Sequence, residues 1–193
     1  DNANATIGSL TGVLTGSAAG TSVVTYSVTN VQGCSSLTTT SVTINALPVL
    51  GTITGVNPVC VGSTLNLSNS LTGGTWTIDN VNAMIGSLTG VLTGSAAGTS
   101  VITYSVTNSD GCSNLTTTTV TINALPTVAA ITGLNAVCVG SNITLASTTN
   151  GGVWSVNNTN ATINGSGVLT GSTAGTTTVS YAVTDGNNCT TIV

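Results

Sequence analysis

Five cysteines are the residues of this sequence with the most specific chemistry. They are Cys34, Cys60, Cys112, Cys138 and Cys189. Cysteines pair as disulfides, and groups of cysteine and histidine bind zinc when four ligands lie at close spacings. These cysteines are widely spaced, and the sequence contains no histidine. The pattern therefore favours disulfides over a metal site, and free thiols remain an alternative.

Groups that carry out acid–base or electrostatic chemistry are scarce. The sequence has no Lys, Arg or His and 4 acidic residues, of which Asp79, Asp110 and Asp185 are internal. Nucleic-acid binding relies on Lys and Arg, attachment to anionic lipid needs basic residues, and acid–base catalysis usually recruits His, Lys or paired carboxylates. We expect a non-catalytic chain with no cofactor and no nucleic-acid partner. One aspartate per loop does not favour calcium, which takes about six to eight oxygen ligands.

The remaining composition indicates strands. Hydrophobic residues make up 40% of the chain, enough for a packed core, and they are mostly Val, Ile, Leu and Ala interleaved with Thr and Ser. This mixture favours pleated strands over helices. No apolar run approaches the roughly 20 residues that span a bilayer, so we expect no membrane insertion of this segment.

The sequence repeats itself with a period of 78 residues. Cys34 recurs at Cys112, and Cys60 recurs at Cys138 (112 − 34 and 138 − 60). In the third copy the late positions come one residue early, as at Tyr181. With each unit ending at an Ala-Leu-Pro triplet, we predict the C-terminal part of a repeat at 1–48, a complete repeat at 49–126, and a repeat lacking its last strand at 127–193. We expect the natural polypeptide to continue in both directions.

Turn signals and period-2 alternation within one unit predict an all-β sandwich. Turns recur about every 8 to 12 residues, and apolar residues alternate with Thr, Ser and Asn between them. The predicted inward-facing positions are Leu65 and Leu67, Trp76 and Ile78, Ile102, Tyr104 and Val106, and Val120, Ile122 and Ala124. The connection INALPVLGTITG holds a proline and no Gly/Ser tract, so we expect stiffly coupled domains in a rod.

The cysteine count per unit predicts a disulfide framework. Each of the two later units holds two cysteines, so we predict Cys60–Cys112 and Cys138–Cys189, and Cys34 would find its partner before residue 1. Such a bridge restricts the unfolded chain by about 4 kcal/mol in the entropy model. Oxidised pairs imply export from the cytoplasm.

The aromatic residues have a structural and a functional interpretation. Trp76 and Trp154 fit buried positions between two sheets, although an exposed tryptophan could instead stack on a sugar. Tyr26, Tyr104 and Tyr181 are predicted core residues whose hydroxyls bond to the backbone.

Several sequence strings resemble a known family. GSLTGVLTGSAAGTSVITYSVTN (86–108) resembles the signature of group 2 bacterial immunoglobulin-like domains, in which a G-x-V-T-G-x-x-x-G-T-x-x-I run precedes the late strands. VCVGSTLNLSN, GGTWTI, YSVTNSDGC and VTINALP are together similar to tandem repeats in giant surface proteins of Bacteroidota, including the mobile adhesin of gliding flavobacteria. The resemblance covers essentially the whole chain. It implies immunoglobulin-like β-sandwich domains displayed in tandem at the cell surface.

These features predict a structural segment of a long extracellular stalk, adhesin or filament shaft. Its expected partners are copies of itself along or beside the fibre, and surface glycans. Thr runs at 38–40 and 116–119 also suggest O-glycosylation, because an uncharged surface needs a hydrated cover. The alternative is a spacer or carbohydrate-binding segment of a secreted polysaccharide-degrading enzyme.

Overall fold

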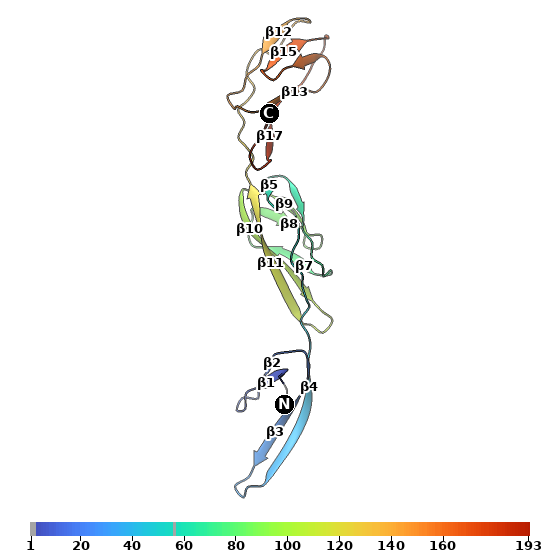
Figure 1. Ribbon diagram of the computed structural model, residues 1–193, viewed down its shortest axis with the longest axis vertical. Coiled ribbons are helices and arrows are strands. Elements are labelled where there is room, and N and C mark those ends of the chain that lie inside the picture. Colours follow the sequence, from blue (N-terminus) through green and yellow to red (C-terminus); the bar gives the residue numbers. More distant parts are fainter. Residues whose placement is uncertain (1–2, 56) are drawn as a thin grey trace.

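The chain folds into strands arranged along a rod. The computed structural model describes residues 3–55 and 57–193, and within these ranges it contains strands and no helix. Every sheet draws its strands from one of three successive stretches: the N-terminal segment (3–48), the middle segment (49–126) and the C-terminal segment (127–193). The three segments follow one another along the long axis (Figure 1). Asp1, the first residue of the first predicted unit, lies outside the described residues.

The N-terminal segment consists of two antiparallel pairs. β1 (Ala5–Ile7) pairs with β2 (Leu14–Gly16). β3 (Gly20–Thr29) pairs along its whole length with β4 (Ser35–Ile44), and this long hairpin forms the lower end of the rod in Figure 1. Most of the hairpin is exposed on both faces.

The middle segment is a two-sheet sandwich. One sheet has the order β5 (Val59–Cys60), β11 (Ser113–Asn123), β10 (Gly98–Thr107) and β7 (Thr75–Ile78). The other has the order β6 (Thr64–Asn66), β9 (Val91–Gly94) and β8 (Ala83–Ile85). Leu92 from the second sheet and Ile102 from the first are both 0% exposed and belong to one apolar cluster. The all-β class and the sandwich arrangement are therefore as predicted.

The C-terminal segment repeats most of this plan. One sheet has the order β12 (Asn142–Thr144), β15 (Val168–Gly171) and β14 (Ala161–Ile163). The other has the order β13 (Val153–Val156), β16 (Val179–Thr184) and β17 (Thr190–Ile192). The sequence ends at Val193, which corresponds to Thr116 of the middle segment, so β17 matches only the first residues of β11.

Alternation identified most of the inward-facing side chains of the middle segment. Leu65 and Leu67 are each 6% exposed, and Val120 and Ile122 are 1% and 2% exposed. Ala124 was wrongly placed on the same face: it is exposed because β11 ends at Asn123, where the chain leaves the sheet toward the next segment.

A tryptophan–tyrosine pair fixes one end of the sandwich. The rings of Trp76 and Tyr104 have centroids 4.4 Å apart and are 5% and 4% exposed. The Tyr104 hydroxyl accepts a hydrogen bond from Gly74 N (2.8 Å) and donates one to Leu71 O (2.8 Å). A Cβ at Gly74 would lie 2.5 Å from the Tyr104 ring, so this turn requires glycine.

The C-terminal segment holds the same pair in the same geometry. The ring centroids of Trp154 and Tyr181 are 4.5 Å apart. The Tyr181 hydroxyl accepts from Gly152 N (2.8 Å) and donates to Thr149 O (2.8 Å). Tyr181 is 5% exposed, whereas Trp154 is half-buried.

The predicted core position of Tyr26 is wrong. Its side chain is 68% exposed on β3. Tyr104, its counterpart, is covered by Trp76 of β7 and bonded to the loop before that strand. The N-terminal segment corresponds to 79–126 and so contains no counterpart of either element. The alternation placed Tyr26 on the correct face of a strand that has no facing sheet.

We expect Tyr104→Phe and Tyr181→Phe to destabilise their own segments by about 1 to 3 kcal/mol each, because each removes the partner of two backbone groups in a poorly solvated turn. Hydrogen exchange of the middle and C-terminal segments would report the loss separately. Tyr26→Phe is the matched control and should change neither segment, since Tyr26 lies on an exposed face.

Candidate functional site at the junction between segments

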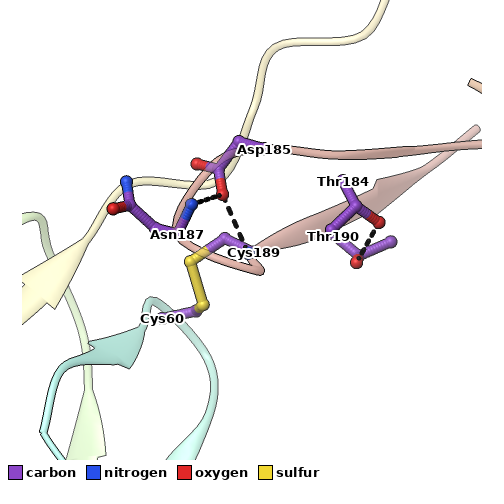
Figure 2. The surroundings of a disulfide bond; sticks show 6 residues. All are labelled: Cys60, Thr184, Asp185, Asn187, Cys189 and Thr190. Atoms are coloured by element: carbon purple, nitrogen blue, oxygen red, sulfur yellow. Dashed lines mark hydrogen bonds between the residues drawn. A yellow bond between two sulfur atoms is a disulfide. The ribbon is translucent and has the colours of Figure 1, made fainter. Parts of the chain in front are cut away.

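The most distinctive chemical feature of the structure is a disulfide between two segments. Cys60 of β5 in the middle segment is bonded to Cys189, which directly precedes β17 in the C-terminal segment, with Cα atoms 5.6 Å apart. The two cysteines are separated by 129 residues in the sequence. Figure 2 shows the bond joining two different parts of the rod. Consecutive segments are thus connected twice, once by the backbone and once by sulfur.

Asp185 positions Cys189 for this bond. Its Oδ1 accepts hydrogen bonds from the backbone N of Asn187 (2.9 Å) and of Cys189 (2.9 Å), as Figure 2 shows. A side-chain oxygen that bonds its own backbone in this way stabilises a tight turn. Across the mouth of the hairpin, the hydroxyls of Thr184 and Thr190 lie 2.8 Å apart. Cys189 itself is 0% exposed.

The same turn occurs in the other two segments. Asn30 Oδ1 accepts from Cys34 N (2.9 Å), and Asn108 Oδ1 accepts from Cys112 N (2.9 Å). An Asn or Asp four residues before each late cysteine is therefore a repeated device that holds the cysteine at the tip of a hairpin. Sequence reasoning missed these residues, although their constant spacing from the cysteine was a usable signal.

Cys60 lies at the opposite end of the middle segment from this hairpin tip. It pairs in parallel with Asn123, the last residue of β11, and Val61 N donates to Asn123 O (3.0 Å). The backbone connection to the C-terminal segment begins at the next residue. Cys60 is therefore fixed at the exit of its sandwich, where the following segment begins.

The predicted pairing within units is wrong. Cys112 directly precedes the 11 residues of β11, and Cys60 pairs with the far end of that strand. A strand of this length spans about 36 Å, whereas disulfide-bonded cysteines need Cα atoms within about 7 Å. Cys60–Cys112 is geometrically excluded, and Cys189 bonds to Cys60 instead of Cys138. Cys34, Cys112 and Cys138 carry free thiols.

Cys112 lies at the equivalent junction between the N-terminal and middle segments. Its Sγ is 3.9 Å from Asn45 O, and Asn45 corresponds to Asn123 beside Cys60. Two amides of the same hairpin also hold the connection: Asn108 Nδ2 donates to Ala46 O (2.9 Å) and Asn114 Nδ2 donates to Pro48 O (2.9 Å). Here polar contacts join the hairpin tip to the preceding segment without a disulfide.

The three internal aspartates lie apart and serve local structure or loops. Asp79 Oδ1 accepts from Val101 N (2.8 Å), Asp185 holds its own turn, and Asp110 is in the turn that Asn108 stabilises. Among the described residues, no three His, Cys, Asp or Glu side chains come together where they could hold a metal ion.

The tryptophans do not form an exposed sugar-stacking surface in the middle segment, because Trp76 is buried against Tyr104. Within the described residues there is also no helix that is long and apolar enough to cross a bilayer.

Comparison with protein-family models gave no match, and comparison with curated proteins gave none either.

Proposed function

We propose that this chain is a structural, non-catalytic segment of a long extracellular stalk, adhesin or filament shaft, built from tandem immunoglobulin-like domains. The observation that carries the proposal is the disulfide from Cys60 to Cys189, which joins one sandwich to the next. A bond at this place does not complete either core. It restricts bending and twisting between neighbours, which is what a load-bearing rod requires.

The connection between the two segments supports the same role. Residues Ala124–Leu125–Pro126 follow β11 directly, and a short connection with proline and no Gly/Ser tract limits swivelling. A second attachment through sulfur removes much of the remaining freedom. Force applied along the rod can then pass from Cys60 to Cys189 without unravelling the chain between them.

An extracellular location follows from the same bond, because disulfides persist in oxidising compartments. The surface is suited to such a place in an unusual way: it carries hydroxyls and amides, with a formal net charge of −4 and no cationic side chain. Thr117 and Thr119 point outward on β11 and are candidate positions for glycans. Copies of the same chain and surface glycans are the partners that fit this surface.

Electron microscopy of the native material, with mass spectrometry of non-reduced protein, tests the proposal. We expect extended rods or fibres with a regular axial repeat, and a peptic fragment that contains both Cys60 and Cys189. Trypsin is unsuitable because the chain has no Lys or Arg. Compact particles without an axial repeat would refute the stalk function, as would a fully reduced Cys60 and Cys189 in the native material.

A further inference from the structure

A groove of about 470 Å³ opens along one edge of the C-terminal segment. Apolar side chains form much of its wall, including Ile131, Val137, Leu145 and Val179. Val137 and Val179 are only half-buried, although each belongs to or packs against the core of this segment. A recess lined largely by apolar side chains is a candidate binding site.

The middle segment shows what occupies the same place in a complete sandwich. Val179 corresponds to Ile102, which is 0% exposed. Ile102 shares its apolar cluster with Val120 and Ile122, two inward-facing residues of β11 that are 1% and 2% exposed. The groove of the C-terminal segment is therefore where two β11 side chains are buried in the middle segment.

The backbone beside the groove also differs between the two segments. In the middle segment β10 begins at Gly98, and its first four residues pair with Thr119 to Ile122 of β11. The corresponding residues 175–178 precede β16 and are not part of a strand. Gly175, Thr176 and Thr177 line the groove. This stretch is thus an unpaired sheet edge, which is a template for an added strand.

One side chain is placed to hold such a strand. In the middle segment Asn57 clamps β11: its Nδ2 donates to Thr119 O (3.1 Å), and its Oδ1 accepts from Thr121 N (3.0 Å). Asn135 corresponds to Asn57, lines the groove and is exposed. A backbone donor and acceptor at the correct register would meet both ends of its amide.

We propose that this groove is a strand-binding site for an extended segment with the residue pattern of Thr116–Asn123, in which two apolar side chains at alternate positions enter the groove and the backbone pairs with residues 175–178. Main-chain hydrogen bonds supply affinity in this mode of recognition, and pockets for alternate side chains supply specificity. The site lies at the opposite edge of the fold question from the disulfide junction, and its existence does not depend on the stalk function.

A labelled peptide tests the site on the full 193-residue chain. The probe has the sequence TTTTVTIN of residues 116–123, and its control is TTTVTITN, which has the same composition but places both apolar side chains on the other face. By fluorescence anisotropy we expect saturable binding of the first peptide and at least about tenfold weaker binding of the second. Hydrogen exchange at residues 175–179 should slow only with the first.

Variants on the protein side separate the groove from non-specific association. Asn135→Ala should weaken binding of the matching peptide about three- to tenfold, because it removes two hydrogen bonds. Asn57→Ala is the matched control and should leave peptide binding unchanged. Equal binding of both peptides would overturn the proposal, as would no saturable binding up to about 1 mM protein.

A second copy of the chain is a natural source of such a strand, since Thr38–Asn45 of β4 reads TTTSVTIN. Analytical ultracentrifugation distinguishes this outcome. A dimer that the matching peptide dissociates would support the groove as the strand-binding site and assign the strand to a second copy. A dimer that forms while neither peptide binds would contradict the proposal.

Discussion

Pulled by its two ends, the oxidised chain should extend about 440 Å less than the reduced chain, because the bond between Cys60 and Cys189 bridges a sequence separation of 129 residues, each worth about 3.4 Å when extended. Force enters the middle segment near Leu50, reaches Cys60 and passes directly to Cys189. The strands between these two cysteines are therefore never placed under tension. Single-molecule force spectroscopy with handles fused to both termini, before and after a reductant, measures the difference.

Two variants sharpen this experiment. Cys189→Ser should give the long extension even without reductant, since it removes the bond and leaves the Asp185 turn in place. Cys112→Ser is the control and should match the oxidised chain, because Cys112 carries a free thiol at the other junction. If the oxidised and reduced chains extended equally, the bond between segments would not carry load and the mechanical part of the proposed function would fail.

The same bond marks the limit of what sequence reasoning could predict. The period of 78 residues, the strands and most inward-facing side chains follow from local pattern, because the side chains of a strand alternate faces whatever the strand packs against. Disulfide pairing is instead a matter of three-dimensional distance. Counting two cysteines per unit suggested a bond within each unit, but Cys60 and Cys112 flank opposite ends of β11 and therefore face different neighbours.

Tyr26 shows the second kind of limit. Its alternation is identical to that of Tyr104, and its exposure is 68% against 4%. Burial depends on whether a facing layer is present, which a local window does not record. The turn residues Asn30, Asn108 and Asp185 were missed for a different reason: Asn is abundant in this sequence, so only the structure revealed that these three bond to the amide of the residue four places on.

Two identical leucines in the two sandwiches provide a strong test of how completeness of the core sets stability. Leu92 and Leu169 occupy the same place in the sequence GVLTG. Leu92 is 0% exposed and enclosed by a core that includes β11, so Leu92→Ala should destabilise the middle segment by about 3 to 5 kcal/mol. Leu169 borders the open groove, so Leu169→Ala should cost the C-terminal segment only about 1 to 3 kcal/mol.

The reason for the difference is the number of packed atoms that each leucine loses. Truncation leaves a cavity whose cost grows with the contacts that cannot be restored, and water already reaches one side of Leu169. Hydrogen exchange at Val91–Gly94 and at Val168–Gly171 measures the two opening free energies in one molecule. Equal losses would mean that the groove walls close around Leu169 in solution, and the site would then have to open before a strand could enter.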